Sequence, residues 1–468
     1  MKNISFNTRL LTALLISCLT FSSCDKFLDT PLPNDQLSTE TVFSTKETIR
    51  DVVTGLYNAY SAYNVGFIER NTAALSDEGG MVSNPGTAIG DYVFANLTTL
   101  NGVQITWASL YTPIYRANLI LENLPKVSST ILPDADRKTY MAAARFVRAA
   151  TYFFLVNSWG DVPLVTTTDA AVNAIMPRTP AADVYALIVS DLQTAVADLS
   201  ETVTSSPTVH NKFQAQALLA RVYLYQSKWA EAEAAATSVI SSGKYQMVTV
   251  LTDVFKKGTP ESIFSLAEYS TNRLYVNRAA VGWVSLPTSA AGALTSSPFV
   301  TDQVLSRIQT GDQRWVNGNW VAPQYTKLFQ NKYRHNLTAT DAAIAAYPQN
   351  LIILRYSEQF LIRAEARTQQ GNITGAATDI NVVRKRAGLP NTTAIDKNGM
   401  LTALENERQF ELYYEGHRYF DLARTNRLNE VVGTLPWKKD NWKTTYRYLP
   451  ILDKDMIVNP FLVQNPGY

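Results

Sequence analysis

Hydrophobic positions recur with a helical period along much of the chain beyond residue 38. The first such stretch follows Ser38 and Thr41, and either hydroxyl group can cap a helix. Apolar side chains three or four positions apart then share one face, which is typical of a helix packed on a core. The same period predicts further helices over 107–124, 136–157 and 183–199. The shared face of the first helix consists of Ile49, Val52, Val53, Leu56, Tyr57 and Tyr60.

Two later segments share a helix–turn–helix pattern with alanines at helical spacing. They are 215–225 with 229–236, and 357–366 with 376–381. Small side chains at these positions let two helix backbones approach closely, and stacked hairpins of this kind are typical of tetratricopeptide-like repeats. The pattern therefore predicts a mostly α-helical fold with tetratricopeptide-like hairpins.

The helical period is lost in two regions, about 64–104 and about 269–347. Gly, Asn, Ser, Thr and Pro interrupt the pattern there, and long insertions within a scaffold commonly carry function. Large aromatic side chains are spread through the second region, and the first contains Asp77 and Glu78. These two regions are the predicted ligand-binding part of the protein.

Aromatic side chains in such numbers suit a surface that stacks on a planar or ring-shaped ligand. Sugar rings pack their C–H faces on aromatic side chains, while their hydroxyl groups need carboxylate, amide or guanidinium partners. Packing inside the protein explains each aromatic residue equally well, and a solvated loop acid is the commoner explanation of Asp77. The residues predicted to contact a ligand are Asp77, Tyr275, Trp283, Trp315, Trp320 and Tyr325.

The N-terminus has the features of a bacterial lipoprotein export signal. Lys2 and Arg9 make a basic start, an uncharged apolar stretch follows, and small residues precede Cys24. Such a segment is too short to span a bilayer. The pattern predicts a signal peptide over 1–23, a lipid on the thiol of Cys24, and an extended tether over 24–37. A plain signal peptide, or a lipidated Cys18, is the alternative.

Composition narrows the possible functions. No cysteine follows Cys24, so an exported chain folds without disulfides and has neither Cys-ligated zinc nor thiol catalysis. The formal net charge is only +2 and no arginine-rich arm is visible, which argues against a nucleic-acid partner. The chain is long enough to bury a large core.

Charged residues also recur at helical spacing near the C-terminus. Arg418, Asp421 and Arg424 lie three residues apart, which favours ion pairs along one helical face. Glutamates at 407, 411 and 415 form a second stripe with one residue per turn. Both stripes predict buried salt bridges between helices rather than a ligand site.

Several blocks of sequence resemble the SusD/RagB family of outer-membrane nutrient-binding lipoproteins. They occur in the order found in that family and extend over nearly the whole chain. The blocks are Cys24-Asp25-Lys26-Phe27-Leu28-Asp29, residues 145–149 with Gly160-Asp161-Val162-Pro163-Leu164, residues 355–366, residues 407–422, and the closing Gln464-Asn465-Pro466-Gly467-Tyr468.

This resemblance implies that residues 38–468 form a single, mostly helical domain with four tetratricopeptide-like units and an irregular, loop-rich part for ligand binding. It further implies a lipid-anchored protein of the outer membrane, exposed at the cell surface, that covers a SusC-like TonB-dependent transporter. Such proteins capture an oligosaccharide and pass it inward without catalysis, and they need no cofactor.

Two other functions remain open from the residues alone. A helical-repeat scaffold can bind a protein and no small ligand. A glycoside hydrolase needs two carboxylates about 5 to 10 Å apart, which Asp77, Glu78 or Asp91 could supply. The three histidines, His210, His335 and His417, are scattered without zinc-binding spacing, so no metal site is predicted.

Overall fold

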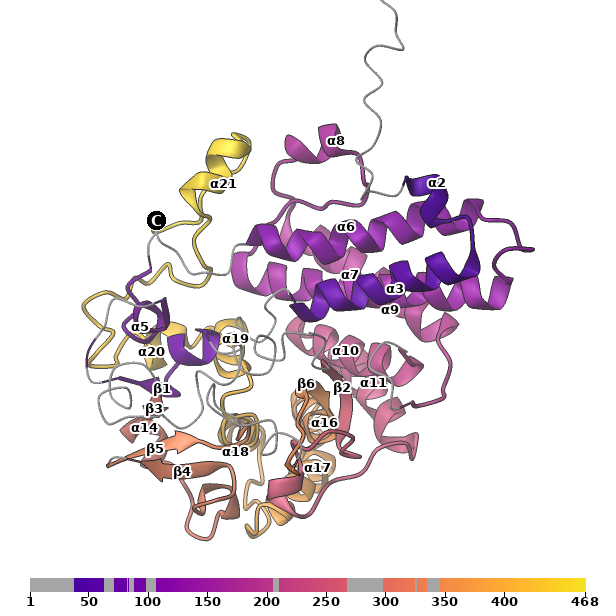
Figure 1. The fold of residues 1–468 in the computed structure, drawn as a ribbon. Helices are drawn as coiled ribbons and strands as arrows, with labels where there is room; N and C mark the ends of the chain where they lie inside the picture. The colour runs from indigo at the N-terminus through magenta and orange to yellow at the C-terminus, as the bar shows by residue number, and fades with distance from the viewer. Residues whose placement is uncertain are drawn as a thin grey trace, which may run out of the picture.

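The computed structural model describes residues 38–62, 71–81, 83, 88–97, 107–204, 210–266, 298–324, 326–334 and 346–468. A series of packed helices forms the body of this part of the chain (Figure 1). Each helix of the series packs on the next, which confirms the mostly α-helical, tetratricopeptide-like fold. The series comprises α6 (Trp107–Asn123), α7 (Asp134–Trp159), α9 (Ala181–Asp198), α10 (Lys212–Tyr225), α11 (Trp229–Ser241), α16 (Tyr356–Gln369), α17 (Ile373–Arg386) and α18 (Lys397–Glu411).

Alanines lie buried where the predicted hairpins pack together. The α16 helix packs on α11 and on α17, so small side chains are needed on more than one of its faces. Side chains at the helix starts supply hydrogen-bond acceptors for free backbone N–H groups: Asn211 caps α10, Asn372 caps α17 and Asp396 caps α18. The fully buried alanines of the two pairs are Ala215, Ala217, Ala220, Ala232, Ala236, Ala364, Ala366 and Ala376.

The predicted first helix is in fact two helices, α2 (Thr39–Val42) and α3 (Lys46–Ala62). Ser38 caps α2, because its Oγ accepts a hydrogen bond from the backbone N–H of Thr41 at 3.2 Å. The longer α3 packs on α6 and α7. The predicted face of α3 is buried except at Val52, which is only partly covered.

Short elements occupy the described parts of the two regions predicted to be irregular. Helices α5 (Ala88–Val93) and α14 (Asp302–Leu305) lie there, and so do two antiparallel strand pairs. Elements of two to six residues are too short for a helical period to reveal. The pairs are β1 (Gly79–Gly80) with β3 (Phe299–Val300), and β4 (Val321–Gln324) with β5 (Lys327–Gln330). A third antiparallel pair joins β2 (Ser262–Leu266) to β6 (Leu351–Arg355).

The β1–β3 pair joins the two insertion regions directly. Glycine is required in β1 because a Cβ on Gly80 would lie 2.9 Å from the ring of Phe299. A Cβ on Gly79 would lie 2.6 Å from the hydroxyl oxygen of Tyr414. The two glycines that follow Glu78 therefore let the first region pack against the second.

The C-terminal part contains α19 (Arg418–Arg424), α20 (Leu428–Val431) and α21 (Asp453–Val458). Its last residues bind back to the end of α7: Asn465 Nδ2 donates to the carbonyl oxygens of Trp159 at 3.0 Å and Leu449 at 2.8 Å. Among the residues that the structure describes, no helix is both long and apolar enough to cross a membrane.

Candidate functional site

A buried ionic cluster ties the C-terminal helices to the second insertion region. The glutamate stripe of 407, 411 and 415 forms the predicted buried salt bridges, and neighbouring carboxylates share cations. Glu407 binds Arg314 at 2.6 Å, Glu415 binds Lys332 at 2.5 Å and Arg355 at 2.7 Å, and Glu411 contacts Arg314, Arg355 and Arg386.

Burial and opposite charge act in different directions in this cluster. Burial alone would raise the pKa of Glu411, but the guanidinium groups of Arg386, Arg355 and Arg314 outweigh it and hold the pKa well below its ordinary value. Burial lowers the pKa of Lys332 to about 8 in spite of the nearby Glu415. Glu411 therefore stays ionised, and its negative charge compensates the positive charges of the surrounding arginines.

Asp77, predicted to contact a ligand, is buried and bound to protein groups instead. Its carboxylate accepts hydrogen bonds from Arg418 Nε at 2.8 Å, from Arg307 Nη2 at 2.7 Å and from Gln409 Nε2 at 3.2 Å. Burial favours the neutral acid, but Arg418 and Arg307 outweigh it and lower the pKa of Asp77 to about 2. Asp77 thus anchors the first insertion region to α19 and does not face a ligand in solvent.

The second charged stripe is only partly as predicted. Asp421 and Arg424 form the expected pair three residues apart, at 2.9 Å. Arg418 does not join them; it pairs with Asp77 and with Glu405 at 3.0 Å. Helical spacing alone could not show that Arg418 pairs with Asp77, a residue more than 300 positions away.

Glu78 is fully buried beside Asp77, so a solvated loop acid is the wrong interpretation for both residues. Its Oε2 accepts a hydrogen bond from the backbone N–H of Tyr414 at 3.2 Å. Burial, and then the charge of Asp77, raises the pKa of Glu78 well above its ordinary value. The adjacent acids therefore shift in opposite directions, because only Asp77 contacts arginine side chains.

Replacing Glu78 with glutamine is expected to raise the free energy of unfolding at neutral pH. Glutamine keeps an acceptor oxygen for Tyr414 and takes up no proton on folding. A carboxyl with a raised folded-state pKa contributes most stability at low pH and loses it as the pH rises. The gain from Glu78→Gln should therefore vanish below about pH 4.5. Urea unfolding at neutral and acidic pH measures the gain in the free energy of unfolding, and the exposed Glu47→Gln variant is the control. An unchanged free energy of unfolding for Glu78→Gln at pH 7 would contradict the prediction.

The tryptophans of the second insertion region differ in accessibility. Trp320 is buried; its Nε1 donates to the carbonyl oxygen of Leu251 at 2.9 Å, and Lys332 Nζ lies 4.3 Å from its ring. The prediction that Trp320 contacts a ligand is not supported by this position, because the ring packs inside the protein. Trp315 is partly exposed and packs edge-on against Phe410 and Tyr413. Cys24, Tyr275, Trp283 and Tyr325 lie outside the described residues.

One cavity lies beside the β2–β6 pair and is named here the strand cavity. Its volume is about 580 Å³, within the range of small-ligand sites. Tyr60 at the end of α3 stacks on Phe264 of β2, so the described ends of α3 and β2 meet next to it. Residues whose polar groups suit hydroxyl ligands line it, among them Thr204, Gln214, Lys244, Lys257, Ser262 and Asn350.

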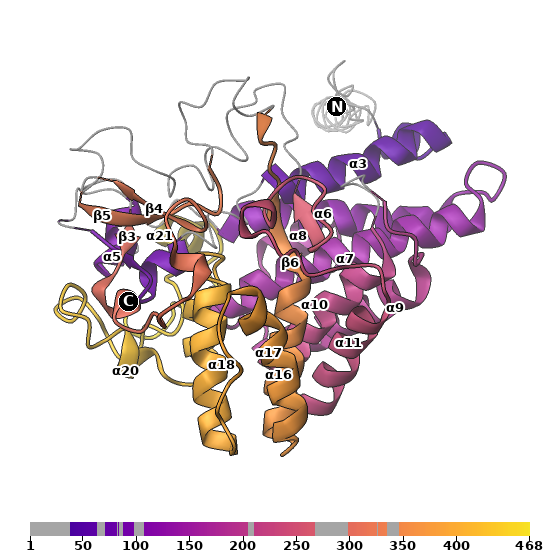
Figure 2. The same ribbon diagram turned by 90° about the horizontal axis from the view of Figure 1, so that it is seen from below.

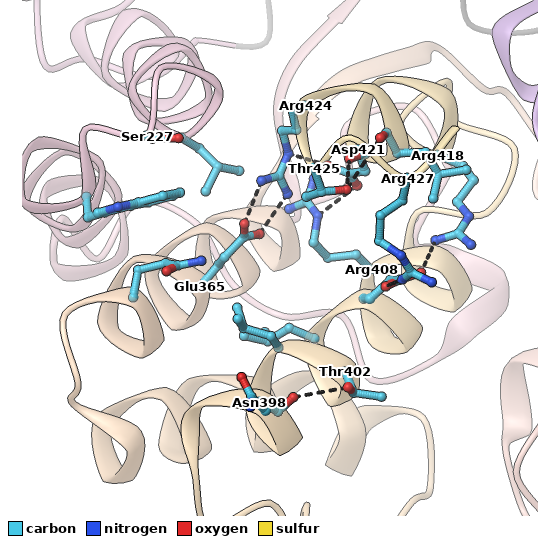
Figure 3. Close-up of a pocket in the computed structure, with 17 residues that line it drawn as sticks. Ser227, Glu365, Asn398, Thr402, Arg408, Arg418, Asp421, Arg424, Thr425 and Arg427 are labelled. Carbon is cyan, nitrogen blue, oxygen red and sulfur yellow. Dashed lines mark hydrogen bonds and ion pairs between the residues drawn. The ribbon is translucent and has the colours of Figure 1, made fainter. Parts of the chain in front are cut away.

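A second cavity, the helix cavity, lies among α10, α11, α16, α18 and α19 (Figure 3). Its volume is about 570 Å³. One wall is a chain of ion pairs: Arg408 holds Asp421 with two hydrogen bonds of 2.8 and 3.0 Å, and Arg424 holds Glu365. Figure 2 shows α16 extending away from β6 beside α18. Glu365 lies about 13 Å along α16 from its start, so this cavity is distant from the strand cavity.

The two cavities differ in chemistry. The described residues that line the strand cavity include no carboxylate. In the helix cavity, Arg408 and Arg424 outweigh burial and lower the pKa of Asp421, so this acid stays charged and paired. These walls offer hydrogen-bonding groups for a ligand but no pair of unengaged acids of the kind glycoside hydrolysis needs.

Most of the cavity-lining residues could not be recognised from the sequence. Glu365 belongs to a predicted hairpin, and Arg408 belongs to a block that carries the family resemblance. Lys244, Lys257 and Asn350 lie in turns and coil, where nothing in the local sequence distinguishes a lining residue from any other polar surface residue. Trp229 was noted only as part of a hairpin, although it lines the helix cavity.

Comparison with known proteins gives consistent matches. The sequence model of the SusD family matches residues 272–468, and a model described as starch-binding and associating with the outer membrane matches residues 26–224. A SusD-like protein of Formosa agariphila is 29% identical, with 100% of this chain and 99% of that protein covered.

Solved structures show the same fold. A laminarin-binding SusD-like protein is 25% identical with a TM-score of 0.74, covering 91% of this chain and 100% of that one. Surface glycan-binding protein A of Bacteroides thetaiotaomicron, solved with laminarihexaose, is 23% identical with a TM-score of 0.74 and covers 90% and 99%.

The fold and its cavities define a tetratricopeptide-like helical protein with a loop-rich part inserted between its hairpins. Two family models together match most of the chain, and the structures similar to it have the same architecture. The chain belongs to the SusD/RagB family.

Proposed function

We propose that the protein is a non-catalytic receptor that captures a glycan outside the cell and delivers it to a SusC-like TonB-dependent transporter. The observation that carries the proposal is the likeness to the laminarin-binding SusD-like protein across 91% of this chain. The description of the second matching family as starch-binding also supports a glycan ligand. The transporter and the delivery step follow from the resemblance to the SusD/RagB family.

The insertion regions form the proposed glycan site. Trp315 is the aromatic candidate that is both described and partly exposed, and Tyr275, Trp283 and Tyr325 belong to the same stretch of sequence. The strand cavity lies where the chain enters this stretch at Leu266 and adds hydroxyl, amide and ammonium groups. Aromatic faces for sugar rings and polar groups for their hydroxyls would then act together.

Binding without hydrolysis suits these walls better than catalysis. A hydrolase needs one carboxyl group as acid and another as base or nucleophile. Asp77 is held by two arginines, and Glu78 is buried with its Oε2 bonded to the backbone. Two of the three acids predicted as candidates for such a pair are therefore occupied in the fold.

Attachment at the outer membrane is proposed through a lipid on Cys24. The name of the matching family supports association with that membrane. Each buried methylene of a lipid chain contributes about 0.8 kcal/mol, so several chains hold a protein firmly. The residues from Cys24 to Leu37 would then connect the anchor to α2.

Removing three aromatic side chains of the insertion should abolish most glycan affinity. A glycan array that includes laminarihexaose and starch fragments identifies the ligand, and titration calorimetry then measures affinity. For Tyr275→Ala/Trp283→Ala/Trp315→Ala, loss of about 1 kcal/mol per stacked ring predicts weakening of roughly 100-fold. The control Trp442→Ala removes a partly exposed ring outside the insertion and should bind normally.

Two results would count against this proposal in different ways. Normal affinity in the triple variant would show that the site lies elsewhere. Absence of any glycan ligand for the wild-type protein would favour the alternative of a helical-repeat scaffold that binds only proteins. Product formation from the bound glycan would instead show a hydrolase.

A further inference from the structure

Six exposed apolar residues gather on two neighbouring segments, α8 (Ala170–Ala174) with its following turn and α21 with the coil after it. Ile457 and Val458 are each 80% exposed, Val463 is 71% exposed and Phe461 is 55% exposed. We name this surface the edge patch; its residues are Val172, Ile175, Ile457, Val458, Phe461 and Val463.

Specific hydrogen bonds hold the two segments of the edge patch together. Asn459 Nδ2 donates to the carbonyl oxygen of Met176 at 2.9 Å. Arg178 donates to the carbonyl oxygen of Val463 at 2.5 Å and to Asn465 Oδ1 at 2.6 Å. The patch is therefore one surface built on a bonded backbone.

Contiguous exposed apolar surface is uncommon on a protein that has no partner for it. Each Å² of such surface removed from water contributes about 25 cal/mol. The six side chains are each at least 47% exposed and none belongs to the hydrophobic core, so polar side chains there would disturb the described fold little. The patch thus has the composition of a contact surface.

The location of the patch limits what can cover it. Figure 1 shows α8, α21 and α2 along the same edge of the molecule, and α2 begins just after Ser38. The residues from Cys24 to Leu37 span at most about 50 Å when fully extended. A lipid on Cys24 therefore keeps this edge close to the membrane.

The charges near the patch favour a protein over a lipid surface. Helices that lie on membranes are usually rich in Lys and Arg, with aromatic residues at the interface. The α21 helix begins with Asp453, Lys454 and Asp455, and α8 contains no basic residue and is capped by Asp169. Protein interfaces, in contrast, combine an apolar centre with a polar rim.

We propose that the edge patch docks onto an apolar surface at the extracellular side of a membrane-resident protein, the transporter of the proposed function. This inference rests on that function. It assigns the contact to α8 and α21, at the outer edge of the helical series, and leaves the insertion regions available to the ligand.

The test is co-purification from the native membrane. The full chain, tagged and expressed with its neighbouring transporter, is compared with an Ile457→Ser/Val458→Ser/Phe461→Ser variant after detergent extraction. The variant should retain at least about tenfold less transporter, with unchanged thermal midpoint and unchanged glycan affinity. The matched control, Val250→Ser/Leu305→Ser, changes exposed apolar residues elsewhere and should retain the transporter normally.

Each other outcome overturns the inference. Normal transporter recovery with the triple-serine variant shows that the patch is not the docking surface. No transporter with the wild-type chain, in a protein that still binds glycan, removes the partner but not the ligand part of the proposed function. Patch-dependent binding of the full Cys24→Ser chain to phosphatidylethanolamine–phosphatidylglycerol vesicles indicates a lipid occupant. Patch-dependent dimers in analytical ultracentrifugation indicate a second copy.

Discussion

Glu411→Gln is expected to lower the free energy of unfolding by about 3 to 5 kcal/mol, the usual cost of removing one partner from a buried ion pair. Glu411 lies in a buried cluster of five cations and five carboxylates, so its loss leaves one positive charge uncompensated. Urea unfolding at pH 7 measures the change. The cations are Arg314, Lys332, Arg355, Arg384 and Arg386, and the carboxylates are Glu261, Asp312, Glu407, Glu411 and Glu415.

A compensating variant separates lost charge balance from lost packing. Glu411→Gln/Arg386→Met removes one charge of each sign and should unfold at a higher urea concentration than Glu411→Gln alone. Exposed Glu430, which pairs with nearby Arg427, supplies the control, and Glu430→Gln should leave the midpoint unchanged. Wild-type stability in Glu411→Gln would show that the cluster adds nothing to stability.

The helical scaffold could be predicted from sequence because its signals are local. Apolar side chains at a 3.6-residue period and alanines at helix contacts both lie within one or two turns of each other. The predicted 215–225 and 229–236 pair corresponds to α10 and α11, and the predicted 183–199 helix corresponds to α9, with ends shifted by a few residues. The stripe of glutamates at 407, 411 and 415 was likewise correctly predicted to be buried.

The candidate site could not be predicted to the same degree, because its contacts are long-range. Asp77 is held by Arg418, Arg307 and Gln409, all more than 200 residues away, and no spacing rule links them. Trp320 and Trp315 lie five residues apart in the same insertion, yet one is buried and the other partly exposed. Composition can predict that aromatics are present but not which of them face solvent.

Asp77 connects the first insertion region to other parts of the fold. Thr301 Oγ1 donates to the backbone carbonyl of Asp77 at 2.7 Å, and Thr301 directly follows strand β3. The side chain of Asp77 binds Arg418 of α19. One residue thus connects the first insertion region, the second insertion region and the C-terminal helices, so its charge should matter for the whole fold.

Asp77→Asn is expected to reduce the free energy of unfolding at neutral pH by about 2 to 3 kcal/mol. The estimate follows from the fall of the Asp77 pKa from 3.8 to about 2, at about 1.4 kcal/mol per unit. A carboxyl with a lowered folded-state pKa contributes its full stability above the unfolded value and loses it as the pH falls through the folded value. The difference between wild type and variant should therefore shrink from about pH 4 to pH 2.

Urea unfolding of both proteins across this range is the measurement, because the difference cancels the titration of all other acids. Asp51→Asn on the exposed side of α3 is the matched control and should follow the wild type at every pH. A deficit for Asp77→Asn that stays constant down to pH 2 would mean that lost hydrogen-bond geometry, rather than lost charge, weakens the fold. A deficit that disappears with acid would instead show that the charge of Asp77, neutralised by Arg418 and Arg307, attaches the first insertion region to the helical scaffold.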